Sequence, residues 1–110
     1  MSAPPHPVVN RYFELDAARD VESTVALFAE DATVVDEGQT HHGPAEIRAW
    51  RVGPASTYAY TTEIKDTEVL RPGHYVVDVR LTGNFPGGTA DLRFDFTVTH
   101  DRITHLVIAP

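Results

Sequence analysis

Two residues in the first third of the chain, Tyr12 and Asp36, have side chains that could carry proton chemistry. Val34 and Asp36 lie two positions apart in a β-branched segment, so a buried Val34 would bring the carboxylate inward on the same strand face. Burial raises the pKa of a carboxyl group, which suits a general base near neutral pH. Tyr12 could donate a hydrogen bond from the floor of a pocket. The alternatives are a solvent-exposed turn aspartate before Gly38 and a core tyrosine bonded to backbone or water.

The histidines offer a second set of candidates. His41 and His42 are adjacent, so their side chains point apart in an extended chain, and no third ligand lies nearby in the sequence. We therefore predict no metal site and no cofactor. His42 could carry protons at a pocket mouth, or it could be a loop residue without a role. We assign no role to His74, His100 and His105.

Composition limits the classes of protein to which the chain can belong. It has 110 residues, 42% hydrophobic and 23% charged, which predicts one globular domain over residues 1–110. The formal net charge of −7 argues against nucleic acid and anionic membranes as partners. The sequence has no cysteine and no recognisable signal peptide or membrane-spanning stretch, so we expect a soluble cytoplasmic protein.

The first half of the chain has mostly helical periodicity. Apolar spacing predicts a helix over residues 8–16 and a second over 20–31, with Phe28 on its buried face. Residues 33–36 are β-branched and predict a short strand, and residues 44–53 predict a third helix with a proline in its first turn.

The second half alternates with the period of a strand. The alternating runs predict strands over residues 58–65, 74–82, 89–99 and 103–109. Helices followed by an antiparallel sheet with one apolar face predict an α+β fold, with the helices laid across that face.

The hairpin between the second and third of these runs has a testable register. Pairing Thr82 with Thr89 places apolar residues together on one face and opposite charges together on the other. The apolar pairs are Val79–Leu92, Val77–Phe94 and Tyr75–Phe96, and the charged pairs are Arg80–Asp91 and Asp78–Arg93. A slip of one residue would mix the two faces, so we predict this register.

Apolar and aromatic residues could line a cavity for a flat hydrophobic ligand. The candidates are Phe28, Val34, Trp50, Tyr58, Tyr60, Tyr75, Phe94 and Phe96. The alternative is that these residues fill the core, which is the usual role of such rows. Both can hold for one row, because a cavity is lined by whatever the core leaves unfilled.

Three segments carry a resemblance to a known superfamily, namely ARDVESTVALFAEDATVVDEG, the helix start GPAEIRAW and the closing hairpin TVTHDRI. Over nearly its whole length the chain resembles SnoaL-like, or nuclear-transport-factor-2-like, proteins, which include bacterial ketosteroid isomerases and polyketide cyclases. The resemblance implies a cone-shaped barrel (a cystatin-like roll) of three N-terminal helices packed on a strongly curved antiparallel sheet. It also implies a cavity at the wide end and a homodimer that pairs through the sheet. Such a fold hosts many unrelated activities.

The resemblance also implies roles for two residues. Tyr12 falls at the position of the isomerases' oxyanion-stabilising tyrosine. Asp36 falls at the position of their general base, which moves a proton from the carbon beside a carbonyl to another carbon of the same substrate.

Three positions depart from the isomerase pattern. The second oxyanion donor, an aspartate, is expected on the strand at residues 89–99, but there the register points Phe94 inward and puts Asp95 on the charged face. Arg51 stands where a tyrosine is expected behind the oxyanion tyrosine, and Glu37 stands where the isomerases have proline.

We therefore expect a small-molecule-binding protein with a hydrophobic pocket. If it is catalytic, the reaction would be a proton transfer of the ketosteroid-isomerase type on a carbonyl or polycyclic substrate, or a polyketide-cyclase-like reaction. One alternative is a non-catalytic ligand-binding or dimerisation module of the same fold. A third hypothesis is an epoxide-hydrolase-like activity, since members of the superfamily that open epoxides use an aspartate–arginine–aspartate group in the pocket. It would need Asp78, Arg80 and Asp91 to converge inside the cone. We expect solvated ion pairs there, because burial would set these charges against the apolar stripes of the helices.

Overall fold

The computed structural model describes residues 7–53 and 59–110, which form three helices packed on a six-stranded sheet. The helices are α1 (Pro7–Ala17), α2 (Val21–Val25) and α3 (Gly43–Val52). The strands are β1 (Phe28–Asp36), β2 (Gln39–His42), β3 (Tyr60–Arg71), β4 (His74–Gly83), β5 (Thr89–Thr99) and β6 (Arg102–Ala109). The α+β class and the three helices are as predicted.

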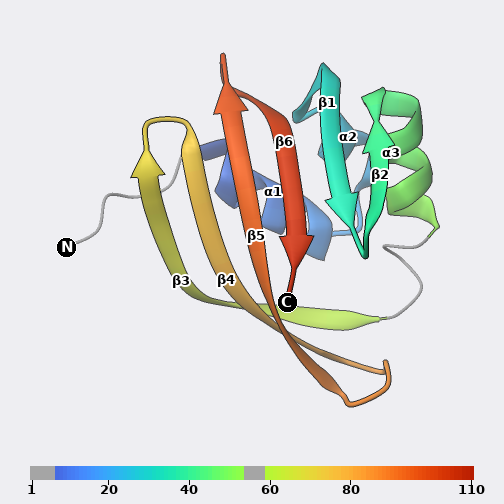
Figure 1. Cartoon of the computed structure of the whole chain (residues 1–110). Helices are drawn as coiled ribbons and strands as arrows, with labels where there is room; N and C mark the ends of the chain where they lie inside the picture. The colour runs from blue at the N-terminus through green and yellow to red at the C-terminus, as the bar shows by residue number, and fades with distance from the viewer. Residues whose placement is uncertain (1–6, 54–58) are drawn as a thin grey trace.

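The sheet has the strand order β2-β1-β6-β5-β4-β3 and carries the helices on one side (Figure 1). All neighbouring strands are antiparallel except β1 and β6, which are parallel. The prediction of a wholly antiparallel sheet was therefore wrong for this one pair. The exception involves β1, which follows the second helix in the chain and lies beside the last strand, β6.

The register predicted for β4 and β5 is confirmed. Thr82 lies opposite Thr89, and each of the predicted apolar and charged pairs is formed. The apolar face meets the helices, where Val77, Val79 and Phe96 are almost wholly buried. This face and the apolar stripe of α1 form the core of the described chain together with residues of α3, β1 and β6, such as Ile47, Val34 and Leu106.

The second helix is shorter than predicted. It ends at Val25, and Phe28 begins β1 instead of completing a helical face. Ile103 explains the difference, because its N–H donates to the carbonyl of Leu27 at 2.9 Å and its backbone pairs with Phe28. A spacing of three residues after Val25 fits a helical turn, but pairing with β6 buries Phe28 just as well.

Two features of the sheet extend beyond the sequence pattern. Strand β2 was not predicted, because its four residues are polar and mostly exposed. Strand β3 continues to Arg71 instead of ending near residue 65, since an irregularity between Ile64 and Asp66 interrupts the alternation there. The predicted start of this strand at Tyr58 lies outside the described residues.

Candidate active site

A cavity of about 500 Å³ lies where α1 and α3 meet the ends of several strands. This volume is in the range of sites for small organic ligands. The wall combines residues of α1, α3, the β1–β2 turn, β3, the β4–β5 hairpin and the end of the chain. They are Tyr12, Asp36, Glu37, Gly38, Trp50, Arg51, Tyr60, Leu81, Phe85, Pro86, Ala90, Leu92, Phe94, Ile108, Ala109 and Pro110.

Tyr12 reaches the cavity from the buried face of α1. Its ring packs edge-on against Phe13 and Phe96, with ring centroids 5.3 and 5.5 Å away, and only 1% of the residue is exposed. Burial raises the pKa of Tyr12 far above its ordinary value, and the positive charge of Arg51 offsets only part of this effect. The phenol therefore stays protonated. Among the described residues, none forms a hydrogen bond with its hydroxyl group. The hydroxyl is thus a donor available to a ligand.

Asp36 reaches the same cavity from the last position of β1. Val34, which shares its strand face, is completely buried, so the inward alternation of this strand brings the half-buried carboxylate to the cavity wall. The Trp50 indole Nε1 donates to Asp36 Oδ2 at 3.0 Å. One carboxylate oxygen is thereby held by α3. Asp36 also directly precedes the two-residue turn of Glu37 (φ 52°) and Gly38 (φ 74°). The residue is therefore both next to a turn and part of the cavity wall.

A buried ionic cluster borders the cavity. The guanidinium of Arg51 on α3 pairs with the carboxylate of Asp16 on α1, and both side chains are less than a tenth exposed. The Tyr60 hydroxyl donates to the same carboxylate, 3.4 Å from Oδ2. The guanidinium carbon of Arg51 lies 5.3 Å from the centroid of the Trp50 ring, within cation–π range.

The electrostatics of this cluster keep Arg51 charged and Tyr60 neutral. Burial lowers the pKa of Arg51, but its neighbours Tyr12, Asp16 and Tyr60 outweigh burial, and the net shift is upward. Burial, followed by the negative charge of Asp16, raises the pKa of Tyr60. The sequence analysis did not predict this cluster. One pattern that indicates it is the position of Asp16, one helical turn after Tyr12 in an otherwise apolar stripe, where a charged side chain needs a buried partner.

A smaller hollow of about 250 Å³ lies on the other side of the ionic cluster. Arg51 and Tyr60 line both hollows, whereas Asp16 lines only the smaller one. Arg51 therefore reaches the main cavity, whereas its partner Asp16 does not.

The predicted pocket-lining residues separate into two groups. Trp50, Tyr60 and Phe94 are part of the cavity wall. Phe28, Val34, Tyr75 and Phe96 are not, and they pack in the hydrophobic core instead. The rings of α1 cover the sheet at these positions, since Tyr12 contacts both Phe28 and Phe96. The remaining candidate, Tyr58, lies outside the described residues.

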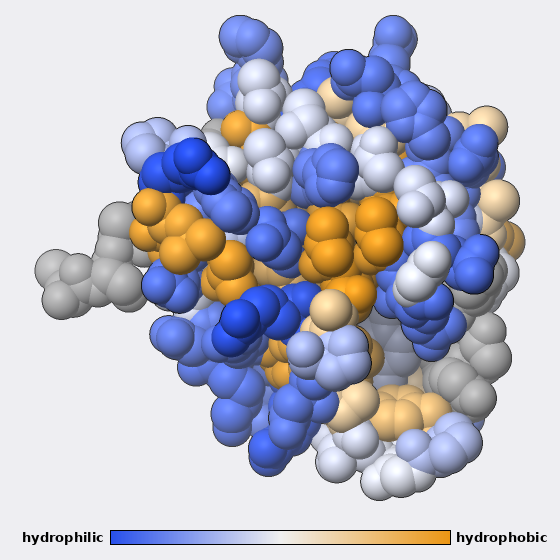
Figure 2. Space-filling view, in the orientation of Figure 1, coloured by the Kyte–Doolittle hydropathy of each residue, from blue (hydrophilic) through white to orange (hydrophobic). Residues whose placement is uncertain are grey.

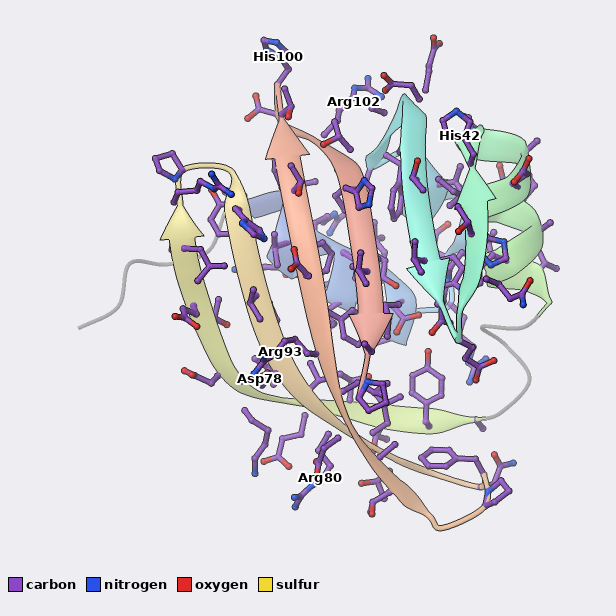
Figure 3. All side chains as sticks on the ribbon, viewed as in Figure 1. His42, Asp78, Arg80, Arg93, His100 and Arg102 are labelled. Atoms are coloured by element: carbon purple, nitrogen blue, oxygen red, sulfur yellow. The ribbon has the colours of Figure 1, made fainter. Side chains whose placement is uncertain are left out.

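The charged residues of β4 and β5 do not enter the cavity. Figure 3 shows Asp78, Arg80 and Arg93 on the side of the sheet that faces away from the helices. Arg80 Nε donates to Asp91 Oδ1 at 2.8 Å and Arg93 Nε to Asp78 Oδ1 at 3.2 Å. The four side chains are 44–70% exposed. The convergence of Asp78, Arg80 and Asp91 that the third hypothesis requires is therefore not formed.

Residues 94 and 95 divide between the two faces as the register predicted. Phe94 lines the cavity, whereas Asp95 forms a pair with His74 on the outer face, with 2.7 Å between Oδ1 and Nε2. The acidic second donor of the isomerases therefore has no counterpart at Asp95.

His42 lies away from the cavity. Figure 3 shows it at the end of β2 remote from the β1–β2 turn, and its Nδ1 is 3.1 Å from the Thr33 hydroxyl. Within residues 7–53 and 59–110, no three His, Asp or Glu side chains are grouped as metal ligands would be. No helix in these ranges is long and apolar enough to cross a membrane.

Solved structures with this fold come from proteins of several kinds. A proposed polyketide cyclase from Sinorhizobium meliloti is 33% identical, with a TM-score of 0.87 over 93% of each chain. The epoxide hydrolase/cyclase-like enzyme SalBIII of salinomycin pyran-ring formation is 20% identical, with a TM-score of 0.79 over 92% of this chain and 85% of its own. A Mycobacterium tuberculosis protein in complex with estradiol-17beta-hemisuccinate is 18% identical, with a TM-score of 0.79 over 94% and 90%.

The family assignment follows from the sequence match itself. None of the curated proteins compared with the chain matches it significantly. Residues 9–106 match the SnoaL-like domain, and the chain belongs to this family.

Proposed function

We propose that the protein binds a small, mostly apolar carbonyl compound with a β,γ double bond in the main cavity, removes a proton from the carbon next to the carbonyl and returns it to the γ carbon, so that the double bond becomes conjugated. Asp36 would take and return the proton, and the Tyr12 hydroxyl would donate a hydrogen bond to the enolate-like oxygen. One observation carries this proposal: two groups of complementary chemistry, from α1 and from the end of β1, line the same cavity.

The state of each group supports its proposed role. The Tyr12 phenol is protonated and forms no hydrogen bond with the described residues, so a ligand oxygen would be its partner. Trp50 holds one oxygen of Asp36 and leaves the other for the substrate. The apolar part of the wall, including Leu92, Phe94 and Ile108, suits a hydrophobic ring system. Steroid binding by a structural neighbour is in keeping with such a ligand.

The test is the conversion of a β,γ-unsaturated ketosteroid to its conjugated isomer, followed by absorbance. We expect Asp36→Asn to lower the rate roughly 10²- to 10⁴-fold and Tyr12→Phe roughly 10²- to 10³-fold. Asp95→Asn is the matched control, because it changes the same group on the outer face, and its rate should equal that of the wild type.

Two results would remove the isomerase proposal: no turnover by the wild type, or equal rates for the wild type and Asp36→Asn. Saturable binding of the steroid without turnover would identify a ligand-binding module instead. The low accessibility of Tyr12 and Trp50, each 1% exposed, is the observation that favours this alternative.

Epoxide opening is a second candidate, with residues other than those expected from the sequence. Asp36 and Arg51 line the cavity, and Asp16, which lines only the smaller hollow, pairs with Arg51. In this reaction Asp36 would take a proton from the attacking water, and Arg51, held by Asp16, would stabilise the alkoxide left when the carbon–oxygen bond of the epoxide breaks. That alkoxide would then take up the proton from Asp36. Diol formation from styrene oxide, abolished by Asp36→Asn and by Asp16→Asn, would support it. The same rate in both variants as in the wild type would exclude it.

We also propose a homodimer that pairs through the outer face of the sheet. Val35, Val107, Asp95 and Val76 lie side by side in one row across β1, β6, β5 and β4. Figure 2 shows apolar side chains gathered in the middle of this face among polar ones. Sedimentation should give a dimer for the wild type and a monomer for Val35→Glu with Val107→Glu, two partly exposed neighbours in this row. A monomeric wild type at micromolar concentration would refute this assembly.

A further inference from the structure

The main cavity contains a buried cation that proton transfer by Asp36 and Tyr12 does not use. Arg51 is only 4% exposed and lines the cavity together with Tyr12. Its counter-ion, Asp16, lines only the smaller hollow on the far side. A group bound in the main cavity therefore lies against Arg51 and not against Asp16.

The position of the guanidinium is fixed on two sides. Asp16 holds it from one side, and Tyr60 supports that carboxylate with a further hydrogen bond. On the other side it lies over the ring of Trp50, whose Nε1 donates to Asp36. Arg51 thus lies within the width of one indole of the proposed base, and it is a charged neighbour of the Tyr12 hydroxyl.

We propose that Arg51 acts with Tyr12 as a two-part site for an anionic oxygen, so that the cavity selects compounds with an ionisable enol or phenol oxygen on an apolar body. The chain has no aspartic acid donor in the cavity at the β5 position, where Phe94 lies. The guanidinium of Arg51 can donate a hydrogen bond to the ligand oxygen, as a neutral second donor would. Because it is charged, it also favours the ionised oxygen over the neutral one more strongly. The inference deepens the proposed function, and it rests on the same cavity.

This site makes a prediction about ligand charge that is independent of turnover. Two probes of nearly the same shape separate charge from size: 4-nitrophenol, whose ionised form absorbs in the visible range, and 4-nitroanisole, which cannot ionise. We expect the wild type to bind the phenolate more tightly than the anisole. The phenolate preference should rise in Asp36→Asn, because that variant removes a nearby negative charge.

The decisive variant is the double substitution Arg51→Met with Asp16→Asn, which removes the pair without leaving a buried charge unpaired. We expect it to lose roughly 10- to 100-fold of the phenolate preference while its affinity for 4-nitroanisole stays the same. Arg51→Lys, which keeps the charge, should retain part of the preference. Circular dichroism checks that each variant is folded.

Several results would overturn the inference. One is a phenolate preference that survives in the double variant. Another is binding of 4-nitrophenol in its neutral form at a pH where the free compound is ionised. A third is failure of the folded wild type to bind either probe. The outcome is separable from that of the isomerase test. A wild type that prefers phenolate through Arg51 but turns over no ketone would retain this inference and lose the proposed reaction. Turnover without any effect of Arg51 on phenolate binding would do the reverse.

Discussion

Breaking the buried ion pair between Asp16 and Arg51 should cost far more stability when one partner is removed than when both are. Both side chains are less than a tenth exposed, so each single substitution leaves a charge that water cannot solvate. Two unit charges about 4 Å apart interact by about 4 kcal/mol at an effective dielectric constant of about 20. We therefore expect Asp16→Asn and Arg51→Met each to lower the free energy of unfolding by about 3–5 kcal/mol. The double variant should lie close to the wild type, because it buries no unpaired charge.

Urea denaturation of the four proteins gives the coupling energy as a double-mutant cycle. The matched control is the same cycle at Arg80 and Asp91, a pair of the same residue types on the exposed face of the sheet. That cycle should show no comparable coupling, because water and salt screen the pair. The reasoning would be refuted if the two single effects at Asp16 and Arg51 simply added, or if the exposed pair coupled as strongly.

Three further predictions concern stability. Burial raises the pKa of Tyr12, so above about pH 10 the native state keeps a proton that the unfolded chain loses, and stability falls by up to about 1.4 kcal/mol per pH unit. Tyr12→Phe should remove this contribution, and urea titrations at pH 8 and 11 would measure it. Gly38→Ala should lower the free energy of unfolding by about 1–2 kcal/mol through backbone conformation alone, since φ is 74° and the added Cβ meets no atom within 4 Å. An unchanged thermal midpoint would contradict this. Phe96→Ala should cost about 3–5 kcal/mol by leaving a cavity in the core, as measured by urea unfolding.

Periodicity made the sheet and α1 predictable. The β4–β5 register follows from the sequence because any slip would move charges such as Asp78 and Arg93 into the core. The inward orientation of Asp36 followed in the same way from its alternation with Val34. Both arguments are short-range, because they relate positions on one strand or on two strands joined by a hairpin.

The contacts that complete the site were beyond such arguments. Trp50 and Asp36 are 14 positions apart, and Arg51 and Asp16 are 35 apart. Both contacts depend on where α3 is placed against α1 and β1, to within the length of a hydrogen bond. For the same reason, residues such as Phe96 were predicted to line the cavity but lie in the core, where the rings of α1 cover them.

The position of α3 therefore decides the chemistry that the cavity can perform. The edge of the Trp50 indole holds Asp36 and its face carries the guanidinium of Arg51, so one buried side chain sets both the proposed base and the proposed cation. Ile47, which is completely buried on the same helix, anchors α3 in the core. A family that keeps the sheet and changes the polar residues of this helix can change the charge of the group that its cavity accepts without refolding the core. That is a physical reason why one fold can host several reactions.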